Sequence, residues 1–289
     1  MCMSVNICLV TTDHLKDRLW FKDDDDFKVG MNYVAVLAAT TPVQIMAFVL
    51  MSNHVHFVVE GADEDIVDFI TRFKQAYSNY FNRKYSSKEL LRNNSVNIQK
   101  LPIGDESVER AVAYVHMNPV AANICSHSSG YPWGTGSLLF SRMSSNCSRI
   151  GTFSKRAQAK IVHSRILLPP DYIVDEKGFI SPLSYVQIKF VESVFRTPNR
   201  MNYFLQNSSK SSNSRQQKLL PTFKDQIIFS AMEDLCSCLF KKNNHSELNQ
   251  IQKTELVKQI KRRFSADPHQ ISRVTGIPYE TILQMLDTF

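Results

Sequence analysis

Short apolar runs alternate with longer stretches of helical period along the first half of this chain. Val5–Thr12, Val43–Leu50 and Val55–Val59 are rich in branched and aromatic residues, as β-strands are. Only the short turn Met51–Asn53 separates the last two runs. We therefore expect these two runs to pair as a hairpin.

Two stretches, one after the first strand and one after the third, carry apolar residues every three or four positions, which is the period of an α-helix. The first begins after the acidic run Asp23–Asp26, and its apolar residues are Phe27, Met31, Val34 and Ala38. The second spans Glu64–Lys84, and its apolar residues are Ile66, Ile70, Phe73, Tyr77 and Phe81. The helix dipole favours carboxylates at a helix N-terminus, so we expect the acidic run to be a solvated helix start rather than a cation site.

A fourth strand over Val96–Ile103 and a helix over Ser107–Met117 complete the pattern, and we expect Pro119 to close that helix. The order strand, helix, strand, strand, helix, strand is that of a ferredoxin-like split βαβ domain. The sequence thus predicts an α+β fold with an antiparallel sheet. Helices would cover one face of the sheet, and the other face would be open or covered by later residues.

The remaining residues predict an all-helical C-terminal extension behind a linker. The linker is the low-complexity string NSSKSSNSRQQ. A connecting segment that packs on or near the first domain precedes it, with a hairpin-like stretch at 169–182 and a helix over Tyr185–Phe195. The expected divisions are 1–146 for the sheet domain, 147–206 for the connecting segment, 207–217 for the linker and 218–289 for the helical domain.

The end of the chain resembles a helix-turn-helix. Two short helical patterns, Pro268–Val274 and Pro278–Leu286, flank Gly276, and a longer one spans Ser246–Phe264. Their expected core residues are Ile271, Val274, Ile277, Ile282, Met285 and Leu286. The basic cluster Lys261-Arg262-Arg263 favours duplex DNA binding by this domain; plain helical packing is the alternative.

Composition places the chain among ordinary globular proteins and favours a polyanionic partner. The chain has 289 residues, a net charge of +7, 43% hydrophobic and 21% charged residues. No apolar run reaches the roughly 20 residues that a membrane span needs, and the N-terminus carries no signal-peptide pattern. The six cysteines show no disulfide-like framework, so we expect a cytoplasmic protein with free thiols.

The hairpin carries the first candidate for chemistry. His54 and His56 are two residues apart in one strand, so both imidazoles point to one face of the sheet, and Glu60 shares that parity. Two such imidazoles make half of a metal site that needs further ligands. A chance pair on a half-exposed strand is the alternative.

The helix at Ser107–Met117 carries the second candidate. Tyr114 and Asn118 are four residues apart and share one helical face. An amide oxygen adds a hard ligand to two histidines, and a phenol beside the metal can attack a phosphodiester. The alternative is that Tyr114 is a tyrosine on the helix surface and Asn118 caps the helix before Pro119. His116 lies on another face and is a fallback ligand.

Other residues of the first domain admit DNA contacts. Tyr77 lies on the apolar stripe and is expected in the core, although Tyr77 and Tyr80 are both alternative nucleophiles. Tyr80 and the basic residues around it have two interpretations: they contact the DNA backbone, or they form a solvated helix face. The residues concerned are Arg72, Lys74, Tyr80, Arg83 and Lys84. Trp133 is expected to pack against the sheet, with base stacking as the alternative.

Three ordered motifs resemble those of the single-tyrosine HUH endonucleases, and within them the REP-associated tyrosine transposase branch of the insertion-sequence transposases. That family shows Met-Pro-Asn-His-x-His, Tyr-Ile-x-x-Asn-Pro-Val and Tyr-x-Trp-Ser-Ser. This chain has Met51-Ser52-Asn53-His54-Val55-His56, Tyr114-Val115-His116-Met117-Asn118-Pro119-Val120 and Tyr131-Pro132-Trp133-Gly134-Thr135. The resemblance covers roughly residues 1–140. The chain departs from it at Ser52, where the family has proline, and at Gly134-Thr135, where the family has two serines.

The resemblance implies an HUH catalytic domain that cleaves single-stranded, hairpin-bearing DNA. It implies that His54, His56 and Asn118 bind Mg²⁺ or Mn²⁺ and that Tyr114 forms a 5′-phosphotyrosine link and releases a 3′-hydroxyl. The branch favours a monomer over a dimer. Two other functions stay open: a domesticated regulator that binds DNA without cutting it, and a metal-dependent hydrolase with a water nucleophile.

Overall fold

The structure is a computed structural model, and it describes residues 5–15, 18–87, 90–91, 93–141, 147–213, 225–264 and 266–287. The chain forms two compact units, which we call the sheet unit and the helical unit. The sheet unit comprises 1–13, 24–51 and 55–215, and the helical unit comprises 14–23, 52–54 and 216–289. No helix among the described residues is long and apolar enough to cross a bilayer.

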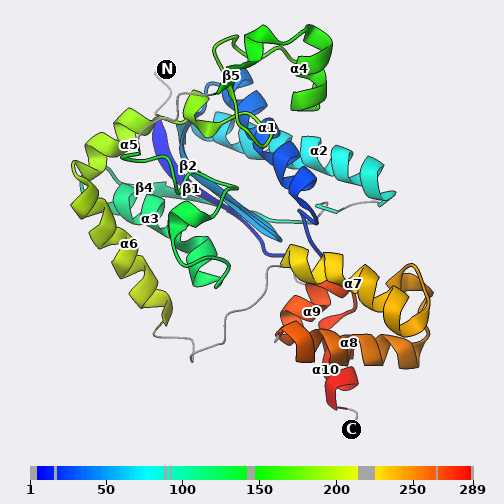
Figure 1. Cartoon of the computed structure of the whole chain (residues 1–289). Helices are drawn as coiled ribbons and strands as arrows, with labels where there is room; N and C mark the ends of the chain where they lie inside the picture. Colours follow the sequence, from blue (N-terminus) through cyan, green and yellow to red (C-terminus); the bar gives the residue numbers. More distant parts are fainter. Residues whose placement is uncertain are drawn as a thin grey trace. The chain divides into compact units, whose positions relative to one another are not determined.

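The sheet unit is built on the predicted ferredoxin-like arrangement (Figure 1). Its first elements are β1 (Asn6–Thr12), α1 (Asp24–Thr40), β2 (Gln44–Met51), β3 (His54–Gly61), α2 (Asp63–Tyr85), β4 (Val96–Leu101) and α3 (Ser107–Ala121). The four strands lie in the order β2-β3-β1-β4, and β1 pairs antiparallel with both β3 and β4. The predicted fold class is confirmed.

Strand β3 is buried on both of its faces, and its alternate side chains differ in kind: apolar Phe57 points to one face and polar His56 to the other. Phe57 packs edge-on against Phe69 and Phe73 of α2, which shares its side of the sheet with α1. His56, one residue earlier, must point to the opposite face, where its ring contacts Tyr114 of α3. Figure 1 shows α3 on the opposite side of the sheet from α1 and α2.

Helix α3 runs further than the sequence predicts. It continues through Pro119 to Ala121, so the expected end at Met117 is wrong. A proline in the last turn removes only one N–H donor, and the backbone N–H groups after it close the turn: Ala122 donates to Asn118 O and Ile124 to Pro119 O, at 3.0 and 2.9 Å. Asn118 is therefore a helical residue one turn after Tyr114.

The acidic run at the start of α1 is only partly solvated. Asp24 and Asp25 are exposed, but Asp26 is fully buried, so the expectation of a solvated run is wrong for Asp26. Its carboxylate accepts hydrogen bonds from Tyr80 (2.9 Å), Lys84 (2.7 Å) and Tyr85 (2.9 Å) of α2. A charge buried in this way needs those donors, which tie α1 to α2.

Later residues extend the sheet unit along the free edge of β2. Val186 forms a parallel bridge with Ile45, and Gly134 forms an antiparallel bridge with Val49. The elements of this part are η1 (Ser128–Gly130), β5 (Ser148–Arg149), η2 (Ile150–Thr152), α4 (Lys155–Val162), β6 (Ile173–Val174), η3 (Pro182–Ser184), α5 (Ile188–Phe195) and α6 (Pro198–Asn213). Helix α6 includes residues 207–213 of the expected linker, and residues 214–217 of that linker lie outside the described residues.

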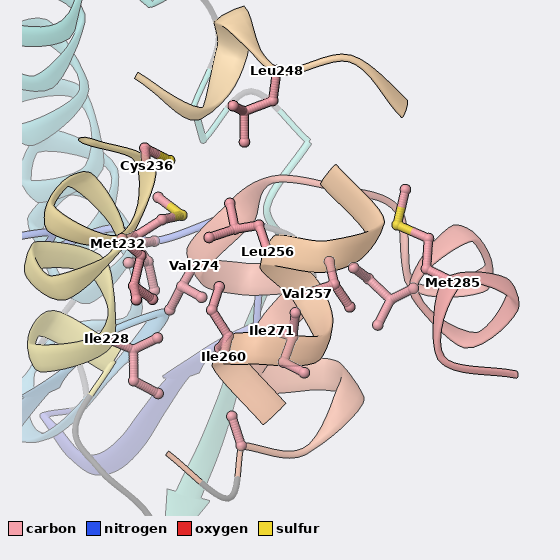
Figure 2. Close-up of a cluster of buried hydrophobic side chains, with 14 residues drawn as sticks. Ile228, Met232, Cys236, Leu248, Leu256, Val257, Ile260, Ile271, Val274 and Met285 are labelled. Carbon is pink, nitrogen blue, oxygen red and sulfur yellow. The ribbon is translucent and has the colours of Figure 1, made fainter. Parts of the chain in front are cut away.

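The helical unit has one apolar core, shown in Figure 2. Its elements are α7 (Asp225–Phe240), η4 (His245–Glu247), α8 (Gln250–Phe264), α9 (Pro268–Thr275) and α10 (Tyr279–Asp287). The core contains or contacts all six residues that the sequence predicts for it, and it also contains Leu19 from the segment 14–23. Gly276 turns the chain between α9 and α10 with a φ of 69°, in the left-handed region that glycine tolerates.

Asp225 at the start of α7 joins three segments of the helical unit. Its buried carboxylate accepts hydrogen bonds from Ser52 Oγ (2.6 Å), Gln270 Nε2 (2.8 Å) and the Arg273 guanidinium (3.1 and 3.3 Å). Ser52 stands where the resembled family has proline, and a proline offers no hydroxyl for this bond. The departure at Ser52 thus has a structural role.

Replacing Asp225 with Ala should lower the unfolding free energy of the helical unit by about 3 kcal/mol, because Arg273 would stay partly buried without its counter-ion. Urea denaturation followed by circular dichroism measures the change. Asp234→Ala, at an exposed position of the same helix, is the matched control and should change stability by less than about 0.5 kcal/mol. Equal losses for the two variants would contradict the role of Asp225.

Candidate metal and nucleophile site

His54 is the first residue of β3 and is held by the turn before it. Asn53 Nδ2 donates to the Leu15 carbonyl at 2.9 Å, and the Leu15 N–H donates to the Asn53 carbonyl at 3.0 Å. The amide of Asn53 is thereby oriented with Oδ1 toward His54 Nδ1, at 2.9 Å. His54 Nδ1 then carries the proton and Nε2 offers its lone pair, the arrangement typical of a metal-binding histidine.

His56 is fully buried and has a matching partner on the neighbouring strand. Thr11 of β1 lies directly opposite His56 in the sheet register, and Thr11 Oγ1 is 3.0 Å from His56 Nδ1. The hydroxyl fixes the ring plane and leaves Nε2 as the ring nitrogen that could bind a metal. Both predicted histidines are thus oriented through Nδ1 by a neighbouring polar side chain.

A third histidine, which sequence reasoning missed, joins this pair. His14 follows β1, and its ring stacks on that of His54 with centroids 3.6 Å apart and planes at 14°. One ring nitrogen from each of His14, His54 and His56 lies within 4.8 Å of the other two. Because His54 begins β3, its place beside His56 is set by the strand itself. Three imidazoles at this spacing fit a transition-metal ion.

Tyr114 lies beside the histidines on α3. Its side chain is 45% exposed, and its ring meets that of His56 edge-on with centroids 5.2 Å apart. Asn118 Nδ2 donates to the Tyr114 carbonyl at 3.2 Å, so the two residues share a helical face as predicted. This bond uses the amino group of the Asn118 amide and leaves Oδ1 as the atom that can ligate.

His116 is not part of the group of three histidines and has a structural environment. Its ring is buried, and its Nε2 lies 2.9 Å from Thr135 Oγ1. Burial lowers the pKa of His116 to about 4, so the ring is neutral at pH 7. Thr135 Oγ1 also accepts the N–H of Phe48 at 3.0 Å, which connects α3 to the edge strand β2.

The departure at Gly134-Thr135 is explained by close backbone contact with β2. A Cβ atom at position 134 would lie 2.6 Å from the Phe48 carbonyl oxygen, so only glycine fits there. Trp133 next to it accepts a backbone hydrogen bond from Leu50 at 2.9 Å and stacks on Phe27 with ring centroids 5.0 Å apart. Trp133 is buried, and its expected packing role is confirmed.

Several basic residues singled out for DNA contact have partners within the protein. Lys84 and Tyr80 both donate hydrogen bonds to Asp26, and Arg72 pairs with Asp68 at 3.3 Å. Lys74 donates to the Asn94 carbonyl, and Arg83 donates to the Asn79 carbonyl at 3.1 Å. Burial and the Asp26 charge raise the pKa of Tyr80, which makes its phenol a poor nucleophile. Tyr77 is fully buried, as expected. Lys261, Arg262 and Arg263 are exposed in the last turn of α8.

Comparison with known proteins agrees with the motifs. Residues 7–118 match the model of a family described as IS200-like transposases, and this stretch contains the three histidines, Tyr114 and Asn118. Among solved structures, a REP-associated tyrosine transposase bound to a REP hairpin is 15% identical over 47% of this chain and 79% of its own, with a TM-score of 0.37. No curated protein sequence matches the chain. The family match supports a DNA-processing role of the transposase type, and over residues 7–118 this chain resembles the IS200-like transposases.

Proposed function

We propose that this chain is a single-tyrosine HUH transesterase that nicks single-stranded DNA at hairpin-associated sites. The observation that carries the proposal is the contact between the rings of Tyr114 and His56. It puts an exposed phenol next to a group of three histidines, within a stretch that matches a transposase family. A nucleophile and a metal-binding group side by side are what phosphoryl transfer to a tyrosine requires.

In this reaction Tyr114 Oη attacks the scissile phosphorus and the bond from phosphorus to the 3′-oxygen breaks. The phenol loses its proton, and the departing 3′-oxygen gains one. One phosphodiester is thus exchanged for a 5′-phosphotyrosyl ester and a 3′-hydroxyl. Because the number of phosphate ester bonds is unchanged, the same site can rejoin DNA by the reverse attack without an energy source.

His14, His54 and His56 would hold the divalent metal, and Asn118 Oδ1 would add an oxygen ligand. A bound metal supplies polarisation of a non-bridging phosphate oxygen. Asn53 Oδ1 would keep His54 in one tautomer, and Thr11 Oγ1 would hold the His56 ring in its orientation. Imidazole nitrogens suit transition metals better than Mg²⁺, so of the two expected ions this donor set favours Mn²⁺.

The helical unit is proposed to bind duplex DNA next to the cleavage site. Lys261, Arg262 and Arg263 end α8 in solvent, and α9 and α10 have the lengths and the glycine turn of a helix-turn-helix. Removal of the C-terminal helices is a poor test, because Leu19 from the segment 14–23 belongs to their core and would lose its cover. Charge substitutions test the proposal without that damage.

Tyr114→Phe should abolish the covalent protein–DNA adduct and leave DNA binding unchanged, because only the attacking oxygen is removed. The measurement is incubation with labelled hairpin-bearing single-stranded DNA and Mn²⁺, followed by a denaturing gel. Tyr80→Phe is the matched control and should form adduct as the wild type does. Adduct formation by Tyr114→Phe would contradict the assignment of Tyr114 as the nucleophile. Cleavage by the wild type without an adduct would indicate a water nucleophile.

His14→Ala and His54→Ala should each weaken Mn²⁺ binding at least about tenfold, since each removes a ligand. Free Mn²⁺ measured by electron paramagnetic resonance during a titration reports this binding without DNA or activity. His127→Ala, at an exposed histidine outside the group, is the control and should bind as the wild type does. If His14→Ala binds Mn²⁺ normally, the metal is held by the strand histidines and Asn118 alone.

A triple variant in which Gln replaces Lys261, Arg262 and Arg263 should bind hairpin DNA with a flanking duplex more weakly. The slope of log K against log salt concentration should also become shallower, by roughly 0.9 per lost phosphate contact. Binding to a short single-stranded hairpin should change less. Lys155, Arg156 and Lys160 on α4 of the sheet unit provide a control triple of equal charge. Equal salt slopes for the wild type and the α8 variant would assign the helical unit a packing role instead.

A further inference from the structure

A cavity of about 460 Å³ lies beside Tyr114, between α3 and α6 of the sheet unit. The proposed chemistry uses only Tyr114 of its lining, and the sequence patterns did not mark the others. Its walls are formed by Glu106, Arg110, Tyr114, Tyr203, Phe204, Asn207 and Ser208. Its volume lies in the range of small-ligand sites in proteins.

Contacts between α3 and α6, which run side by side in Figure 1, hold the two walls of this cavity together. Arg200 of α6 donates to Glu109 at 3.0 Å and to Glu106 at 3.2 Å, at the start of α3. The guanidinium of Arg200 also lies 5.2 Å from the ring centroid of Phe204, which is buried. The cavity is therefore a built feature of the fold.

Tyr203 presents an aromatic surface that the described residues leave largely uncovered. Its side chain is 62% exposed, although its ring is kept in place edge-on against Phe204 with centroids 5.6 Å apart. A fixed aromatic ring in solvent is the usual stacking platform for an unpaired base of single-stranded nucleic acid. Tyr114, the proposed nucleophile, lines the same cavity.

The polar groups of the cavity complement a nucleotide. The Glu106 carboxylate pairs with Arg110 at 3.2 Å as well as with Arg200, so its charge is balanced. A carboxylate in this setting accepts hydrogen bonds from the amino edge of a base, and an exposed guanidinium such as that of Arg110 binds phosphate.

We propose that this cavity takes the base of a nucleotide next to the scissile phosphate, stacked on Tyr203 with its amino edge toward Glu106. The proposal rests on the proposed function, because Tyr114 defines where the scissile phosphate lies. It adds a substrate-positioning site to the catalytic one. A single unpaired base held here would set which phosphate of the strand reaches the Tyr114 phenol.

A thermodynamic cycle in binding tests this site. The protein carries Tyr114→Phe throughout, so that no strand is cut, and the affinity for hairpin-bearing single strands is measured with and without Tyr203→Ala. Each strand lacks one base, scanned along the positions around the cleavage site. Stacking on one aromatic ring contributes about 1–3 kcal/mol, so Tyr203→Ala should weaken binding about 5- to 150-fold. The loss should vanish for the strand that is abasic at one flanking position.

Two variants complete the experiment. Tyr203→Phe keeps the ring and should bind as the parent does, whereas Phe190→Ala removes another exposed aromatic ring, from α5, and should change nothing. Equal affinity of Tyr203→Ala and its parent for every strand overturns the base site. This outcome is separate from failure of the proposed function, which is the absence of a Tyr114 adduct in the wild-type chain.

Discussion

The burial of β3 on both faces is the constraint on which the rest of the structure depends. One face of this strand carries Phe57 against α2, and the other carries His56 against α3. Buried imidazoles cost free energy unless their nitrogens are bonded, so the strand needs a polar partner for each of them. Thr11 and Asn53 meet that need, and by doing so they direct one nitrogen of each ring toward a common point.

The same bonds connect the histidines to the surrounding architecture. Asn53 binds the backbone of Leu15, which keeps His14 near His54, and Ser52 binds Asp225 at the start of α7. Within the helical unit, Ser52 in the turn before β3 is thus bonded to the same carboxylate as Arg273 of α9. The two departures from the resembled family's pattern have separate structural roles: Ser52 bonds Asp225, and Gly134 allows its backbone to lie close to β2.

Sequence patterns were sufficient where a single element decides the outcome. Period-2 alternation in β3 put His54 beside His56, and the spacing of four residues in α3 put Tyr114 and Asn118 on one helical face. The apolar positions around Gly276 predicted the core of the last two helices. The split βαβ fold also followed from the order of elements, because that order has few compact arrangements.

Residues whose partners lie far along the chain escaped these patterns. His14 belongs to a loop, and the hydrogen bonds of its neighbour Leu15 to Asn53 in the β2–β3 turn help to keep it beside His54. The pairing of β1 with β3 was the available hint. Asp26 looked like a solvated helix start, but Tyr80, Lys84 and Tyr85, more than fifty residues later, bury it. The cavity beside Tyr114 depends on α6, whose last turns have the composition of a linker.

The central claim is that the phenol of Tyr114 becomes esterified to DNA, and mass spectrometry of the trapped adduct tests it most directly. The wild-type protein is reacted with a hairpin-bearing single strand and Mn²⁺, and the denatured product is digested with nuclease and trypsin. Fragmentation of the peptide that begins at Ala111 should place the phosphonucleotide on Tyr114. A phosphonucleotide on Tyr80, Tyr203 or any other residue would contradict the account.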